Sequence, residues 1–307
     1  MNVTNRKDLP AGLWVVATPI GNLDDLTPRA LRALESADQI LCEDTRRTAH
    51  LFSAVGLALD PGRLARFDAH SDLSTVAKWI HFLSSGKSIA LVTDAGTPSV
   101  SDPGSALVAA AHAEGIRVTP VPGVSAVSTF LSVAGWVGTT FTFGGFFPRK
   151  SSERSRLLSA AHHSALSTIW IWFESPHRIQ ETLLEVEHFS RQAQIELKVV
   201  AVKELTKLHE KIFSGTALNV YTAVEKEITS EGTLGEWCFG VEFPKSKSEA
   251  EDQVGTDSQD SAAWVLALGC LIEEGVSPSR AAKRVSQTFD VPKNQAYERA
   301  IHLSAKN

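Results

Sequence analysis

The sequence lacks the short motifs that identify the commonest nucleotide-dependent and metal-dependent enzymes. It contains no GxG, GxxxxGK[ST], GxSxG or HExxH segment, which excludes the dinucleotide fingerprint, the P-loop, the serine nucleophile elbow and the zincin helix. Its three cysteines, Cys42, Cys238 and Cys270, lie far apart and are odd in number. They therefore provide neither a CxxC metal-ligand pair nor a fully paired disulfide framework.

Long hydrophobic runs are absent as well. No stretch approaches the roughly 18 uninterrupted apolar residues that a membrane span requires, and residues 1–10 have no apolar signal core. The ten histidines are scattered, and only His162 and His163 are adjacent. Adjacent side chains point in different directions on a helix, so no metal pair is expected there. We therefore expect a reduced, soluble, cytoplasmic protein that holds no metal and binds no membrane.

The composition that remains is typical of a globular protein. Of the 307 residues, 43% are hydrophobic and 21% are charged. The length exceeds the roughly 150 residues of a common single domain, which favours two domains. The formal net charge of −5, taken alone, argues against a general electrostatic nucleic-acid binder, because phosphate binding requires clustered Lys and Arg.

The negative charge is unevenly distributed along the chain. Residues 248–261 contain five acidic residues and no Lys or Arg, whereas residues 276–307 contain six Lys or Arg and two acidic residues. The acidity thus lies in a polar segment typical of a linker, and the tail is basic. The average charge therefore argues only against indiscriminate binding of nucleic acid.

Apolar runs alternate with helical patterns through the first 121 residues. A helix is predicted from Pro28 with Thr27 as its N-cap, because proline is tolerated at the first helical position. Another is predicted with Ser74 as its N-cap, ending at Gly86. This alternation predicts a mostly parallel sheet covered by helices on both faces. The predicted strands are residues 13–17, 88–93 and 116–121, with a strand-like run at 39–42 and a further helix at 105–113.

From Pro122 the pattern begins again, with hairpin-like spacings among the helices, which predicts a mixed sheet. The predicted strands are 168–173, 195–202, 211–213 and 236–243, and the helices are 125–134, 152–161, 176–189, 217–229, 262–274, 277–289 and 292–305. The predicted fold class is α/β, with two α/β domains and a small C-terminal helical domain. The predicted bounds are 1–121 and 122–243 for the α/β domains, 244–261 for an acidic linker and 262–307 for a basic helical domain.

Three loops rich in Gly, Pro and small hydroxyl residues are the best candidates for a binding site. They are residues 18–23, 94–104 and 121–126, and each follows an apolar strand, where open α/β sheets bind their ligands. Glycine lets a ligand approach the backbone closely, and the hydroxyl groups can form hydrogen bonds. One such loop is more often a simple turn, but three in one chain favour a ligand site.

Charged clusters supply candidates for catalysis, although each has a structural interpretation too. Residues 43–47, Glu-Asp-Thr-Arg-Arg, follow the run at 39–42 and form either an ion-pair network or the rim of an active site. Arg149, Lys150, Arg154 and Arg156 lie beside two phenylalanines; such a segment is more often a solvated helix start than a nucleic-acid contact. Residues 174–178 and 203–207 end apolar strands and leave the same alternatives open.

Taken together, these segments resemble the bacterial 16S rRNA cytidine ribose 2′-O-methyltransferases of the tetrapyrrole methylase superfamily. The match runs in order through about residue 243, and Asp290 to Asn294 and Tyr297 fit the tail of the family. The segments that carry it are residues 17–23, 43–46, 93–98, 101–104, 122–123, 145–150, 174–178 and 204–207.

The resemblance implies two α/β domains that bind S-adenosylmethionine in the cleft between them, and a homodimer. It also implies methyl transfer to a cytidine ribose 2′-hydroxyl in the decoding region of 16S rRNA in the small ribosomal subunit. It further implies which residues contact the cofactor. Phe173 and Gly215 depend on aligning less distinctive strands, whereas the others match motifs of the family: Pro19, Ala95, Gly96, Thr97, Val100, Ser125 and Ala126.

The chain departs from the family pattern at a few positions. A stretch that is commonly rich in histidine reads Asp-Ala-His-Ser-Asp at 68–72, Arg47 stands where histidine is common, and the last strand ends at Phe243 instead of glycine. These differences bear on RNA contacts more than on cofactor binding.

A ribose hydroxyl is a weak acid, so a base or a cation should assist its deprotonation. We expect Asp44 as the base, with Arg46 and Lys150 as phosphate or oxyanion partners, and Arg149, Lys150, Arg154 and Arg156 as contacts to RNA phosphates. Two alternatives are a methyltransferase acting on a small tetrapyrrole and a non-catalytic RNA-binding factor of ribosome assembly. The basic tail and the charged motifs favour RNA over a tetrapyrrole.

Overall fold

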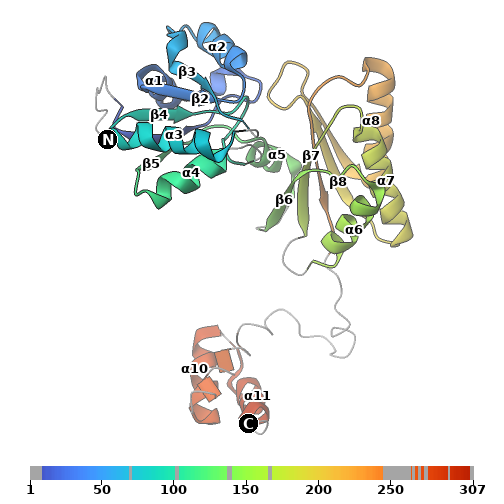
Figure 1. Cartoon of the computed structure of the whole chain (residues 1–307). Helices are drawn as coiled ribbons and strands as arrows, with labels where there is room; N and C mark the ends of the chain where they lie inside the picture. Colours follow the sequence, from blue (N-terminus) through green and yellow to red (C-terminus); the bar gives the residue numbers. More distant parts are fainter. Residues whose placement is uncertain are drawn as a thin grey trace. The chain divides into compact units, whose positions relative to one another are not determined.

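The computed structural model describes most of the chain, and the described residues form two compact units, Met1–Ser246 and Lys247–Asn307. The first unit contains two five-stranded sheets with their helices (Figure 1). None of the helices within the described ranges has the length and apolar character needed to cross a membrane. The described residues are 9–68, 71–100, 104–136, 140–164, 168–244, 264, 267–268, 271–272, 276–289 and 291–304.

The first sheet is entirely parallel, with the strand order β3-β2-β4-β1-β5. Side chains alternate along β1: Leu13 packs with helices α3 and α4 on one face, and Trp14 packs with α1 and α2 on the other. The prediction of a parallel sheet covered on both faces is confirmed. The elements are β1 Gly12–Val16, α1 Pro28–Ser36, β2 Gln39–Cys42, α2 Thr45–Ala54, β3 Leu64–Arg66, α3 Leu73–Ser84, β4 Ser88–Leu91, α4 Gly104–Ala113 and β5 Val118–Val121.

Helix starts in this half follow the capping rules, with one correction. The Thr27 hydroxyl accepts a hydrogen bond from the backbone N–H of Ala30, at 3.1 Å, so α1 begins at Pro28 as predicted. The predicted N-cap Ser74 of α3 is wrong. Asp72 caps this helix, because its carboxylate accepts the backbone N–H of Thr75 at 2.8 Å.

The second sheet is mixed, as predicted, with the strand order β6-β7-β10-β8-β9. Only β6 and β7 run parallel; β10 pairs antiparallel with both β7 and β8. Helix α7 begins at Ile179, later than the predicted start at Pro176. The elements are α5 Ala126–Ala134, β6 Phe141–Phe146, α6 Ser151–His162, β7 Ile169–Glu174, α7 Ile179–Gln192, β8 Lys198–Lys203, β9 Lys211–Thr216, α8 Ala217–Glu231 and β10 Trp237–Glu242.

A buried ion-pair cluster fastens α8 to this sheet. Glu227 of α8 receives hydrogen bonds from Lys203 Nζ of β8 at 3.0 Å and from Lys211 Nζ of β9 at 2.8 Å. Burial opposes ionisation of this carboxyl, but the two lysines outweigh that effect and lower the pKa of Glu227 below its ordinary value. The cluster therefore holds a charged carboxylate at neutral pH.

The second unit contains α10, Pro278–Phe289, and α11, Lys293–Ser304, which pack around a small apolar core that includes Val285 and Ala296. These helices agree with two of the three predicted for the tail. The acidic linker predicted at 244–261 lies outside the described residues apart from Pro244. Most of the helix predicted at 262–274 lies outside them too, and the domain bounds stay a prediction.

Candidate functional site

Three loops at the carboxyl ends of β1, β4 and β5 lie together, as their positions in a parallel sheet require. Thr18 and Gly96 exchange two backbone hydrogen bonds, with N···O distances of 2.9 and 3.0 Å. The hydroxyl of Thr97 donates to the carbonyl oxygen of Val124 at 3.0 Å. The loops after β1, β4 and β5 are thus joined to one another directly.

Two glycines permit this close approach. A Cβ at Gly123 would lie 2.9 Å from the Cβ of Ala17, which is closer than side chains pack. Gly96 has φ +85°, in the left-handed region, and a Cβ there would lie 3.3 Å from Ile20 Cγ2. Neither position accepts a larger residue without movement of the neighbouring loop.

The joined loops and β7 enclose a pocket of about 310 Å³. Two adjacent pockets, of about 740 and about 420 Å³, share Ile20 and Ala95 with it. Together they reach the size range of sites for cofactors and small ligands. The predicted cofactor residues that line the 310 Å³ pocket are Ala95, Gly96, Thr97, Val100, Ser125, Ala126 and Phe173.

Two predicted cofactor residues lie elsewhere. Pro19 lines the 740 Å³ pocket, next to the first. Gly215 lies in β9, paired with Val199, and lines none of the three pockets. The structure therefore brings together every predicted cofactor residue except Gly215.

The amino-terminal end of α2 forms the polar rim of the 740 Å³ pocket. Asp44 is the N-cap of this helix: its Oδ1 accepts the backbone N–H of Arg46 at 2.8 Å, and its Oδ2 lies 2.8 Å from Arg46 Nη2. These hydrogen bonds hold the pKa of Asp44 well below its usual range. A carboxylate so stabilised is a weak base, so this geometry does not favour Asp44 as the proton acceptor.

Two further carboxylates, which the sequence did not single out as separate site residues, line the 310 Å³ pocket. Glu43 accepts a hydrogen bond from the Thr93 hydroxyl, and Asp94 accepts the backbone N–H of Asp44 at 3.1 Å. Asp94 also lies 3.3 Å from a guanidinium nitrogen of Arg47. The segment 43–47 is therefore both an ion-pair network and a pocket rim, the two interpretations that its sequence left open.

A loop of the second sheet closes onto the first. Glu204 and Thr206 have φ +53° and +68°, a backbone conformation that non-glycine residues rarely adopt. Lys207 Nζ lies 3.0 Å from Glu204 and 3.1 Å from Glu236, which lines two of the pockets. The side chain of Lys207 packs so tightly against Gly21 that a Cβ there would overlap it. No local sequence pattern indicated this contact.

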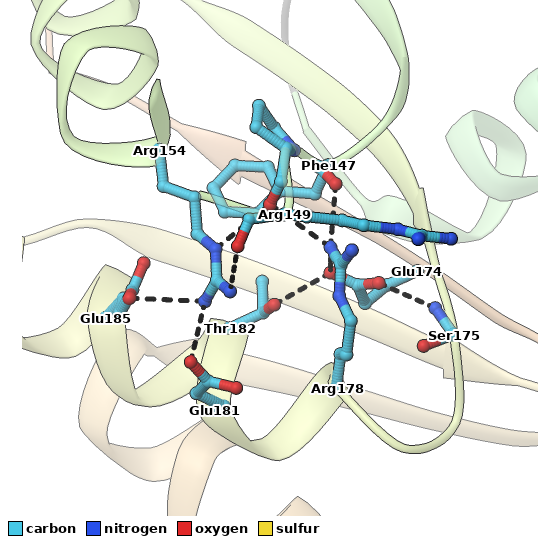
Figure 2. A network of polar contacts seen from close by, with 10 residues as sticks. Phe147, Arg149, Arg154, Glu174, Ser175, Arg178, Glu181, Thr182 and Glu185 are labelled. Atoms are coloured by element: carbon cyan, nitrogen blue, oxygen red, sulfur yellow. Dashed lines mark hydrogen bonds and ion pairs between the residues drawn. The ribbon is translucent and has the colours of Figure 1, made fainter. Parts of the chain in front are cut away.

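Of the four cations predicted to contact RNA phosphates, Arg149, Lys150 and Arg156 are exposed, but Arg154 is only 4% exposed. The Arg154 guanidinium donates to the carbonyl oxygens of Pro148 and Arg149, at 2.9 and 2.8 Å (Figure 2). It also pairs with two glutamates of α7. The prediction that Arg154 contacts phosphates is thus not compatible with its burial.

Comparison with known proteins agrees with this arrangement. The family model described as tetrapyrrole (corrin/porphyrin) methylases matches residues 12–220. The chain belongs to this family. Membership in this methyltransferase family implies that the protein uses a methyl donor.

Several curated relatives are named ribosomal RNA small subunit methyltransferase I. The one from Xylella fastidiosa (strain Temecula1) is 38% identical over 94% of this chain and 98% of its own length. The one from Bacillus subtilis (strain 168) is 35% identical over 99% and 98%. The one from Neisseria meningitidis serogroup B is 42% identical over 70% and 71%. The similarity to these relatives therefore extends beyond residues 12–220, which the family model matches, into the C-terminal part of the chain.

Solved structures agree at the level of the fold. Cobalt precorrin-4 methyltransferase, a cobalamin biosynthetic enzyme, superposes with a TM-score of 0.51 at 19% identity and covers 74% of this chain and 93% of its own. A diphthine synthase superposes with a TM-score of 0.55 at 16% identity, covering 74% and 88%. The prediction of a tetrapyrrole methylase-like fold with two α/β halves is confirmed.

Proposed function

We propose that this protein transfers a methyl group from S-adenosylmethionine to the 2′-hydroxyl of a cytidine ribose in the decoding region of 16S rRNA. The names of the curated relatives support RNA of the small ribosomal subunit as the substrate. The observation that carries the proposal is the junction of two unlike pockets at Ile20 and Ala95. One is smaller and lined by the three joined loops, and the other is larger and has Arg46, Arg47 and His50 among its lining residues.

The smaller pocket fits the methyl donor. Gly96 and Ala126 give its wall little side-chain bulk, and the carboxylates of Glu43 and Asp94 suit the positively charged groups of S-adenosylmethionine. Trp237, which lines the 420 Å³ pocket, has an indole N–H that is buried without a hydrogen-bond partner in the part of the chain the structure describes. A ligand acceptor would satisfy it. When bound, S-adenosylmethionine supplies an electrophilic methyl group on its sulfonium sulfur.

The larger pocket suits a ribose-phosphate acceptor. Arg46 and Arg47, with side chains 89% and 68% exposed, stand at its rim together with His50. Guanidinium groups form paired hydrogen bonds with phosphate oxygens and so fix the orientation of the backbone. The protein then contributes mainly alignment of the acceptor hydroxyl with the donor. In this arrangement Asp44 orients Arg46 and does not itself remove the proton.

Three further expectations belong to this proposal. Lys150, Arg149 and Arg156, which are all exposed, contact RNA phosphates; the protein acts in the cytoplasm; and it forms a homodimer. The homodimer rests on the family resemblance, and its test is the mass measured in solution by light scattering.

The function is tested by offering labelled S-adenosylmethionine with three acceptors in parallel: intact small subunits, protein-free 16S rRNA and a tetrapyrrole. We expect label in small-subunit RNA, at one cytidine whose 3′ phosphodiester bond resists alkaline cleavage, since 2′-O-methylation removes the attacking hydroxyl. Label in the tetrapyrrole alone would identify a small-molecule methyltransferase. Binding to subunits without any transfer would identify a non-catalytic assembly factor.

A further inference from the structure

A buried carboxylate organises the turn between β7 and α7. Glu174 is 3% exposed and accepts three hydrogen bonds: from Arg178 Nη2 at 2.6 Å, from the Thr182 hydroxyl at 2.7 Å and from the backbone N–H of Ser175 at 2.7 Å. Figure 2 shows these side chains converging beneath the segment that follows β6. Arg178 is thereby held in one orientation, with its Nη2 directed at that segment.

The segment above this turn, residues 147–149, has three successive carbonyl oxygens bound by guanidinium groups. Arg178 Nη2 donates to Phe147 at 2.7 Å and to Pro148 at 3.2 Å. Arg154 donates to Pro148 from Nε and to Arg149 from Nη2. Two buried or half-buried cations therefore hold a backbone stretch that lies between β6 and α6, outside either element.

We propose that Arg154 and Arg178 are positioning residues: they fix this segment so that Arg149 and Lys150 meet RNA phosphates at a set place. The proposal rests on the proposed function, because it assigns a task within RNA binding. In Figure 2 the Arg149 side chain extends away from Arg154, whose guanidinium holds the Arg149 carbonyl oxygen. The backbone of Arg149 is thus held while its side chain is exposed. Fixing the origin of a long side chain lowers the ordering cost of each phosphate contact.

The identity of the positioning residues follows from their geometry. Each one binds more than one acceptor at once: Arg154 does so through Nε, Nη1 and Nη2, and Arg178 through Nη2 alone. Arg178→Lys keeps a positive charge near Glu174, but its ammonium group ends one bond short of Nη2 and so away from the carbonyl oxygens of Phe147 and Pro148. An uncharged substitution would leave a buried carboxylate without its partner and would threaten folding.

The first test needs no RNA. Hydrogen exchange in the full-length chain should be faster at residues 147–151 in Arg178→Lys than in wild type, with the interior of α7 unchanged. Arg191→Lys is the matched control, because it alters an exposed α7 arginine that pairs only with Glu187 in the described structure. Unchanged exchange at 147–151 in Arg178→Lys would overturn the proposal.

The second test is a double-mutant cycle on binding to small subunits, with affinity for S-adenosylmethionine measured alongside. We expect Arg178→Lys to weaken subunit binding about 10-fold in the wild-type background and less than about 2-fold when Arg149 and Lys150 are both alanine, since residues that act through one another are not additive. Cofactor affinity should change less than subunit affinity. Equal effects in both backgrounds would overturn the positioning role. If the wild-type chain binds no small subunits, the proposed function fails, and the exchange experiment still decides whether the two arginines fix the segment.

Discussion

Gly96→Ala tests whether the joined loops form the cofactor site. Gly96 has φ +85° and lines the 310 Å³ pocket, and its peptide group exchanges two hydrogen bonds with Thr18. An alanine there is destabilised by the left-handed backbone, and its methyl group lies 3.3 Å from Ile20 Cγ2. Relief of that contact requires a movement of a few tenths of an ångström, which pulls the loop away from Thr18.

Two magnitudes follow from this geometry. The left-handed backbone costs an L-residue about 1–2 kcal/mol, which lowers Tm by roughly 2–4 °C per kcal/mol for a domain of this size. Each of the two backbone hydrogen bonds contributes about 0.5–1.5 kcal/mol net. Cofactor binding in the variant must restore the loop and these two hydrogen bonds at a cost of about 1–2 kcal/mol, which is roughly a 5- to 30-fold rise in Kd.

Gly86→Ala is the matched control. Gly86 follows α3 with φ +83°, and a Cβ there meets nothing within 4 Å. Both variants should lose thermal stability, measured by calorimetry, and Gly96→Ala should lose more, because it also crowds Ile20 and weakens the hydrogen bonds to Thr18. Only Gly96→Ala should raise the Kd for S-adenosylmethionine in a calorimetric titration. An equal rise in both variants, or no rise in Gly96→Ala, would refute the reasoning.

Three other variants test separate parts of the structure. Asp44→Asn should keep methyl transfer within about 10-fold of wild type with an unchanged pH profile, because asparagine also caps helices; a loss of 10²-fold or more would identify a general base. Removing both Arg149 and Lys150 should lower the slope of log affinity against log salt by about 1–2. The ionised Glu227 stabilises the fold fully above the ordinary carboxyl pKa of 4.5, and this stabilisation is lost as the pH falls through the lowered pKa of Glu227 in the folded protein. Glu227→Gln should therefore lower Tm at pH 7, and the Tm of this variant should decline less than that of wild type below pH 4.5.

The sequence predicted the joined loops well because their position depends on local signals. Glycine and proline directly after apolar strands mark the carboxyl edge of a parallel sheet, and all such edges coincide. Helix α2 was missed although its signal was present. Thr48 and Phe52 are its buried residues, four positions apart, and Asp44 stands as N-cap before them. Residues 43–47 are so strongly charged that they indicate a pocket rim or an ion-pair network before they indicate the start of a helix.

Arg154 was misassigned for a related reason. It was grouped with neighbouring cations in the sequence, but on α6 it shares a face with Leu158 and Ala161, which are buried. The helical period therefore predicts its burial. The contact of Lys207 with Gly21 has no such signal, since it depends on how the two sheets approach each other. Local patterns carry no information about that approach.

The place of β10 in the second sheet has a consequence for the order of assembly on the ribosome. This strand, Trp237–Glu242, is the last of its sheet in the chain, yet it lies in the centre and pairs along its whole length with β7 and β8. The parallel sheet is complete once Val121 has emerged from the exit tunnel. In the other half, β7 and β8 lack the strand that lies between them until β10 has been made. Translation of its final strand is therefore the event that joins them.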